Sequence, residues 1–168
     1  MKYLLLLFFS SLSLANELAI KDFGYFYSVP EHAKINDSTV FKIVFDVAQG
    51  AKNGEQNNNI NSLARFINMH VAHGVKSENI QLALVVHGSA SLDVLANTEY
   101  KKRFKTENKN QRLIKQLLAN NAVVYVCGQS ATHNKVSSKQ LIEGVQMSLS
   151  AMTAHAQLQQ QGYTLNPF

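Results

Sequence analysis

The sequence of 168 residues predicts a three-layer α/β/α domain built on a mainly parallel sheet of about five strands. Two observations lead to this prediction. Short β-prone runs alternate along the chain with longer segments of helical periodicity, which is typical of parallel α/β folds. One of these runs, IQLALVVHG at 80–88, is almost continuously apolar, as expected for a strand that is buried on both faces.

Five runs rich in β-branched and aromatic residues are predicted as strands. The last of them stops before Pro167, which has no N–H group for a sheet ladder. The runs are TVFKIVFDVAQG (39–50), the apolar run at 80–88, AVVYVC (122–127), VQMSL (145–149) and YTLN (163–166).

Helical segments separate these strands. The clearest spans 60–74, where apolar residues recur every three or four positions and Gly74 is suited to end the helix. The other helical segments are a weaker one at 91–106, a strong one at 110–121, a short turn at 138–142 and a final helix at 150–162 that ends at Gly162.

The N-terminus is predicted to direct export. Lys2, an apolar run at 4–9 and the small residues Ser13 and Ala15 form the pattern of a secretory signal peptide at 1–15. The apolar run is too short for a membrane anchor, so no stable membrane insertion is expected after cleavage. The sequence therefore predicts a periplasmic or secreted protein, with an extension at 16–38 ahead of a single domain at 39–168.

Polar or reactive residues follow three of the predicted strands. Asp46 lies near the end of the first strand, His87 near the end of the second and Cys127 at the end of the third. In a parallel α/β sheet the carboxyl ends of the strands share one edge, where ligands bind. The predicted site has Cys127 and His87 as catalytic residues, and Gly88, Gly128, Gln129, Ser130 and Asp46 as substrate-binding residues.

Cys127 is the only cysteine, so it cannot form a disulfide within the chain. If a helix begins directly after it, the free N–H groups of that helix favour a thiolate. His87 or His133 could add a positive charge or act as a base. In the alternative interpretation, Cys127 is a small buried hydrophobic residue. The local sequence leaves both interpretations open.

Neither a metal nor a cofactor is predicted. His70 and His73 are three residues apart on one helical segment, but no third ligand is evident. His155 lies among apolar residues, which is typical of a core or interface histidine. The sequence has no glycine-rich dinucleotide motif, no phosphate-binding loop, no G-x-S-x-G and no C-x-x-C.

A basic segment at 101–115 contains seven Lys and Arg residues and one Glu. In an exported protein we interpret this segment as a solvated face with a mild attraction for anions. Nucleic acid is therefore not among the predicted partners.

The chain resembles the DsrE/DsrF-like family over residues 39–168. The resemblance lies in VVHGSA at 85–90, VVYVCGQSA at 123–131 and VQMSLSAMTAHAQLQQQGYTLNPF at 145–168, in this order and spacing. It implies a five-stranded, mainly parallel sheet, a homo-oligomer such as a trimer or hexamer, and a role in sulfur metabolism. It also implies that the cysteine at position 127 carries sulfane sulfur as a persulfide.

Two functional hypotheses follow. In the first, the protein handles sulfur in the periplasm, with a small sulfur-containing anion or a sulfur-relay protein as its partner, and is at most a sulfurtransferase-like carrier. In the second, it is a non-catalytic oligomeric module that binds a small ligand or serves assembly, and Cys127 is structural.

Overall fold

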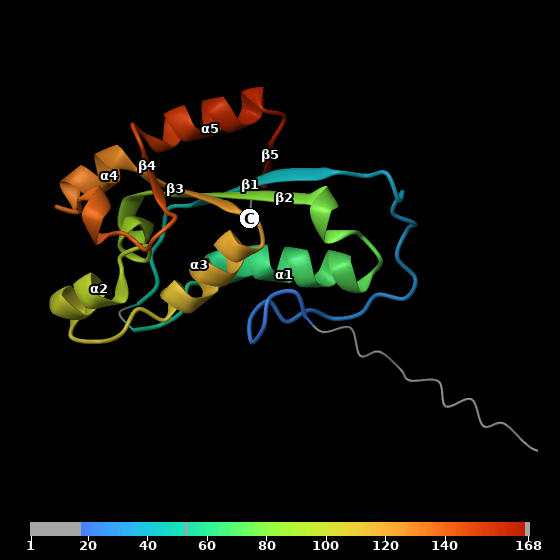
Figure 1. Cartoon of the computed structure of the whole chain (residues 1–168), viewed down its shortest axis with the longest axis horizontal. Coiled ribbons are helices and arrows are strands. Elements are labelled where there is room, and N and C mark those ends of the chain that lie inside the picture. The colour runs from blue at the N-terminus through green and yellow to red at the C-terminus, as the bar shows by residue number, and fades with distance from the viewer. Residues whose placement is uncertain (1–17, 53, 167–168) are drawn as a thin grey trace, which may run out of the picture.

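The protein consists of three layers, with a central sheet between helices on both of its faces (Figure 1). The structure, a computed structural model, describes residues 18–52 and 54–166. The predicted signal peptide at 1–15 lies outside the described residues. In the described part of the chain, no helix combines the length and the hydrophobicity needed to cross a membrane.

The sheet has five strands in the order β4-β3-β2-β1-β5, and every neighbouring pair is parallel. All the strands therefore end at one edge, here called the carboxyl edge, which lies on the left in Figure 1. The strands are β1 (Phe41–Val47), β2 (Ile80–Val86), β3 (Val123–Cys127), β4 (Gln146–Ser148) and β5 (Thr164–Asn166).

The larger core lies between the sheet and the helices α1 (Asn58–Ala72) and α3 (Asn110–Ala119). Successive side chains of a strand point to opposite faces, so alternate residues of β2 enter different cores. Leu82, Leu84 and Val86 pack with residues of α1 and α3. Ala83 and Val85 face the other side. β2 is thus buried on both faces, as its apolar sequence predicts.

The opposite face of the sheet is covered by the helix α5 (Ala151–Gln160). Its core is small, because Ala154 and Leu158 are the only buried residues that α5 contributes to it. They pack against Val44, Ala83 and Val85. Apolar packing therefore holds α5 less firmly than it holds the helices of the larger core.

The remaining helices are short and lie mainly near the carboxyl edge. Two of them come directly after strands, because the chain turns into a helix after β2 and after β3. They are η2 (Gly88–Leu92) and α4 (Gly128–His133), and the others are α2 (Asn97–Phe104), η1 (Ser77–Asn79) and η3 (Ser138–Gln140).

The fold prediction from the sequence is confirmed, with differences at the ends of the elements. The first strand stops at Val47 instead of continuing to Gly50, because the chain leaves the sheet at the carboxyl edge. The weak helical segment at 91–106 is divided, since Leu95 forms an isolated bridge with Leu141 between η2 and α2.

The N-terminal segment at 18–40 contains no helix or strand and packs against the outer side of α1. Ile20 and Phe23 are buried in the larger core. Asn68 of α1 accepts a hydrogen bond from the N–H of Ile20 and donates to the carbonyl oxygens of Ile20 and Phe23, all at 2.9 Å. Gly24 permits the close approach, because a Cβ there would lie 2.3 Å from the backbone of Ala64.

Replacing Asn68 with Ala should destabilise the protein strongly, since it removes three buried hydrogen bonds at once. We expect the free energy of unfolding to fall by about 2–4 kcal/mol. Denaturant unfolding measures this loss, with Asn59→Ala on the exposed side of α1 as the control. Equal stabilities of the two variants would contradict the role assigned to Asn68.

Candidate functional site

The carboxyl edge brings the predicted site residues of three strands together. Val86 of β2 pairs with Val126 of β3, so the next residues, His87 and Cys127, lie side by side across the two strands. Asp46 lies on β1, the next strand of the sheet. By the alternation of side chains, Asp46, His87 and Cys127 all belong to the face that α5 covers.

Donor groups of two helices influence the pKa of the Cys127 thiol. From α4, these are the N–H group of Gln129 and both the N–H group and the hydroxyl of Ser130. From α5, it is the N–H group of Ala151. Cys127 is the N-cap residue of α4, but its side chain makes no capping hydrogen bond to that helix.

Two opposing effects set the pKa of the Cys127 thiol. Burial raises the pKa, because Cys127 is only 5% exposed, but the nearby donor groups of Ser130, Ala151 and Gln129 outweigh it. The net pKa lies below its usual value. Because the thiolate is the reactive form of cysteine, this environment favours nucleophilic chemistry.

One hydrogen bond links the turn after β2 to α4. The N–H group of Gly88 donates to the Ser130 hydroxyl oxygen at 2.9 Å, and Ser130 is one of the residues that lower the pKa of Cys127. Glycine is required at 88, where φ is +52° and a Cβ would lie 2.8 Å from the carbonyl oxygen of Ala48. A Cβ at Gly128 would lie 2.5 Å from the carbonyl oxygen of Ser148.

Asp46 is bound by two histidines. The Nε2 atom of His155 on α5 lies 2.7 Å from Oδ1 of Asp46, and Nε2 of His87 lies 3.1 Å from Oδ2. Burial raises the pKa of Asp46, but hydrogen bonds and charges from His155 and His87 lower it further, so the net shift is downward. Since an ionised carboxylate only accepts hydrogen bonds, we assign a hydrogen to Nε2 of both rings.

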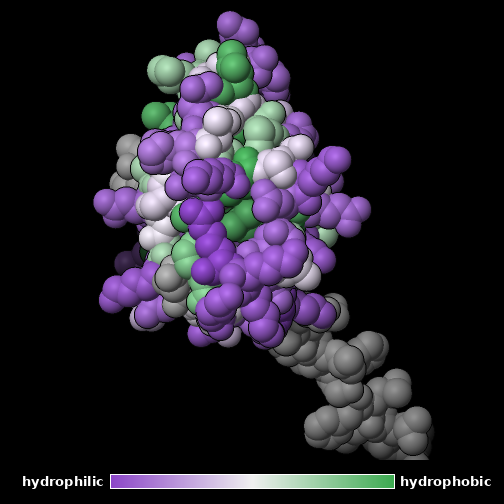
Figure 2. Space-filling view, turned by 90° about the vertical axis from the view of Figure 1, so that its left-hand side faces the viewer, coloured by the Kyte–Doolittle hydropathy of each residue, from purple (hydrophilic) through white to green (hydrophobic). Residues whose placement is uncertain are grey.

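A pocket with a volume of about 480 Å³ lies between the turn after β2 and α4, and Cys127 is not among its lining residues. Gln129 and Ser130, which lower the pKa of Cys127, form part of its wall. Figure 2 views the molecule from the side of the carboxyl edge and shows a mostly hydrophilic face with smaller hydrophobic areas. The residues that line the pocket are Gly88, Ser89, Gln129, Ser130, His133 and Asn134.

The predicted His70–His73 pair lies in a different pocket, at the C-terminal end of α1. The N-terminal segment adds His32 to this pocket, which has a volume of about 240 Å³ and mostly apolar walls. Nδ1 of His70 and of His73 each bonds a backbone carbonyl oxygen one turn earlier in α1. No group of three or more His, Cys, Asp or Glu side chains in the described part of the chain is arranged to hold a metal ion.

Two contributions from α5 were not predicted as part of the site, the N–H group of Ala151 and the imidazole of His155. The sequence contains one signal for the position of the Ala151 N–H group. Ser150 is a favourable N-cap residue directly after a predicted strand, so α5 must begin at the carboxyl edge. His155, predicted as a core or interface histidine, bonds Asp46 through Nε2, while its buried Nδ1 atom has no partner among the described residues.

The fold and the site define a parallel α/β protein with one buried cysteine at the carboxyl edge of its sheet. The chain belongs to the DsrE/DsrF-like family, which it matches over residues 42–167. This family is generally associated with sulfur metabolism. The N-terminal segment that packs on α1 lies outside the matched residues.

Solved structures agree with this assignment at the level of the fold. The YchN protein of E. coli is 23% identical with a TM-score of 0.53, and the match covers 75% of this chain and 100% of that one. MTH1491, a protein of unknown function from Methanobacterium thermoautotrophicum, is 13% identical with a TM-score of 0.53, covering 75% and 97%. No curated protein matches the chain.

Replacing Ser130 with Ala should raise the pKa of the Cys127 thiol, because it removes the hydroxyl donor and leaves the N–H donors in place. The pH dependence of alkylation by iodoacetamide measures this pKa, since Cys127 is the only thiol. We expect the pKa to rise, because the thiolate loses a donor that favours its negative charge. Ser138→Ala, at the start of η3, is the control, and an equal pKa in both variants would refute the role of the hydroxyl.

Proposed function

We propose that the protein is a sulfur carrier in which Cys127 accepts sulfane sulfur as a persulfide. One observation above all supports this proposal, namely the place of Cys127 at the carboxyl edge, beside His87 and at the start of α4, where donor groups of α4 and α5 lower its pKa. These donors stabilise negative charge on Cys127 before the reaction, and the same donors can stabilise a persulfide anion afterwards. Membership of a family associated with sulfur metabolism agrees with this chemistry.

The proposed reaction with thiosulfate requires no further reagent. The Cys127 thiolate attacks the outer sulfur atom of thiosulfate and forms a new S–S bond. The S–S bond of thiosulfate breaks, and its electron pair leaves with sulfite. One thiolate and one dianion thus give one persulfide anion and one dianion, so charge and electrons balance without a proton, an oxidant or a reductant.

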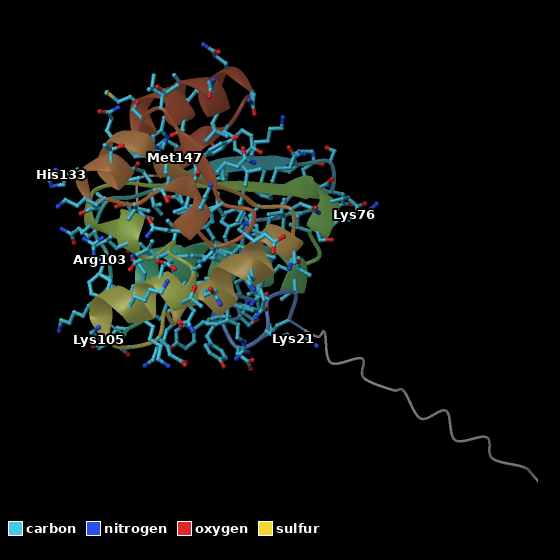
Figure 3. The ribbon with its side chains drawn as sticks, turned by 60° about the vertical axis from the view of Figure 1, so that its left-hand side comes forward. Lys21, Lys76, Arg103, Lys105, His133 and Met147 are labelled. Carbon is cyan, nitrogen blue, oxygen red and sulfur yellow. The ribbon has the colours of Figure 1, made fainter. Side chains whose placement is uncertain are left out.

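The charges around the pocket suit a small sulfur-containing anion. Nη1 of Arg103 donates to the carbonyl oxygen of Asn134 at 2.7 Å, and Asn134 and His133 line the pocket between the turn after β2 and α4. Figure 3 shows Arg103 and His133 on the same side of the molecule. The chain has a formal net charge of +5, which favours the approach of anions.

His87 is proposed to orient the incoming sulfur group. It lies beside Cys127 in the strand register, and its ring is held from one side by Asp46. With Nε2 bound to Asp46, the Nδ1 atom remains for contact with the substrate. Its side chain is 32% exposed, so a ligand in solution can reach it.

We further propose that this chemistry takes place in the periplasm or outside the cell. The support is the signal-peptide pattern at residues 1–15. The donor is a small sulfur-containing anion or a sulfur-relay protein, and the persulfide is passed on to an acceptor thiol.

Sulfur loading can be tested by intact-mass spectrometry after incubation with thiosulfate or polysulfide. We expect the protein to gain the mass of one sulfur atom and to lose it on reduction. Cys127→Ser should gain none, because it lacks the thiol. Wild-type protein that stays unmodified, or that reacts only when it is unfolded, would contradict the proposed function.

The second candidate function is a non-catalytic oligomeric module in which Cys127 is structural. Two observations favour it, the low exposure of Cys127 and the exposed apolar side chains around the start of α5. Leu149 and Met152, at the start of α5, are 74% and 80% exposed, and Met147 on the edge strand β4 is 37% exposed. We propose that these three residues form a contact between copies of the chain in a trimer or hexamer, which is compatible with either function.

Introducing a charge into this apolar surface should reduce self-association. We expect Leu149→Lys and Met152→Lys to give a smaller species than the wild type, because a lysine resists burial in an apolar contact. Light scattering coupled to size-exclusion chromatography measures the mass. Val40→Lys, which alters a 51% exposed residue just before β1, is the control, and a monomeric wild type would rule out the contact.

A further inference from the structure

The pocket at the C-terminal end of α1 is separate from the site at the carboxyl edge. The chain enters α1 after the end of β1 and leaves it toward the start of β2, so the end of α1 lies at the opposite edge of the sheet from Cys127. The pocket has a volume of about 240 Å³. Its apolar walls are formed by Val29, Ala33 and Ile35 of the N-terminal segment and by Met69 of α1.

The polar side chains of this pocket are three imidazoles whose hydrogens are fixed by the backbone. Nδ1 of His32, His70 and His73 each lies 2.7 or 2.8 Å from a backbone carbonyl oxygen. Because a carbonyl oxygen only accepts, we assign the hydrogen to Nδ1 of each ring, and Nε2 of each neutral ring is then an acceptor. Nε2 of His73 accordingly accepts a hydrogen bond from the N–H group of Val29 at 3.4 Å.

His70 presents an acceptor that the protein itself does not use. Its ring stacks on Phe66 with the centroids 3.8 Å apart and meets the ring of Phe41 at 4.7 Å, so its orientation is fixed. In the described part of the chain, no residue bonds its Nε2 atom. Burial lowers the pKa of His70, which keeps the ring neutral and Nε2 an acceptor at pH 7.

The chemistry of the walls limits the kind of ligand that fits. Among the described residues that line the pocket, none is Asp, Glu, Lys or Arg, so neither a cation nor an anion meets an opposite charge there. The apolar walls favour an apolar body. An acceptor in a fixed position favours a ligand with an O–H or N–H group. A neutral, mainly apolar molecule with one donor meets all three conditions.

We propose that this pocket binds a small, neutral, mainly apolar molecule with a hydroxyl group, such as a phenol, and that Nε2 of His70 accepts the hydrogen bond from the hydroxyl. The inference goes beyond the proposed function and does not depend on it, because the pocket and Cys127 lie at opposite edges of the sheet. The wall from the N-terminal segment also lies outside the family match at 42–167.

Phenol and toluene are suitable probes, because they have similar sizes and only phenol has a hydroxyl group. NMR titration of the histidine ring signals measures the dissociation constant of each probe. We expect His70→Phe, which keeps an aromatic ring beside Phe66, to lower the affinity for phenol relative to toluene by about tenfold, since one hydrogen bond is lost. His32→Phe removes the acceptor on an exposed residue of the same pocket and should keep the wild-type ratio.

The wild type provides a second measurement. A hydroxyl bonded to Nε2 favours the neutral ring, so saturating phenol should lower the pKa of His70 further than saturating toluene does. By the same linkage, the affinity for phenol should fall as the pH drops through the pKa of His70. The titratable groups near this ring are His73, whose charge lowers the pKa of His70, and His32, whose ring centroid lies 5.0 Å from that of His73.

Three results would overturn the proposal. They are the lack of saturable shifts with phenol, the same affinity ratio in His70→Phe as in the wild type, and a loss of the ratio in His32→Phe. If thermal unfolding shows that His70→Phe does not fold, an equal pKa of His70 with phenol and with toluene in the wild type overturns it as well. Failure of the proposed function is distinguishable, because it appears as a lack of sulfur loading on Cys127 and leaves phenol binding unchanged.

Discussion

The common direction of the five strands is the constraint on which the site depends. Because every strand is parallel to its neighbours, each one ends at the same edge, and the helix that follows it begins there. β3 ends in Cys127 and leads into α4, while β4 leads into α5, so two helices begin near Cys127 and donor groups of both lower its pKa. An antiparallel β4 would start α5 at the opposite edge and remove one of the donors.

The environment of Cys127 combines burial with hydrogen bonding. Burial alone would keep the thiol protonated, and exposure alone would leave its pKa unchanged. Here the residue is buried, but nearby N–H and hydroxyl groups lower the pKa of its thiol. Of the two interpretations that the sequence leaves open, the structure agrees with the burial of Cys127, and its activation stays a prediction.

Local patterns in the sequence predicted most of the fold and part of the site. The apolar run of β2 and the alternation of strands with helices predict the parallel sheet, and the sheet brings Cys127 beside His87. The bond between His155 and Asp46 joins residues 109 positions apart and depends on the rotation of α5, which periodicity does not specify. The packing of the N-terminal segment likewise depends on one buried side chain, Asn68, which resembles any other helical asparagine in the sequence.

The most direct test of this account is a titration of the thiolate in the folded wild-type protein. Thiolate absorbance in the ultraviolet, taken as the difference between the wild type and Cys127→Ser, reports on a single group, because the chain has one cysteine. The account predicts that the midpoint lies at a lower pH in the folded protein than in denaturant. A midpoint in the folded protein that equals or exceeds that of the unfolded chain would contradict it.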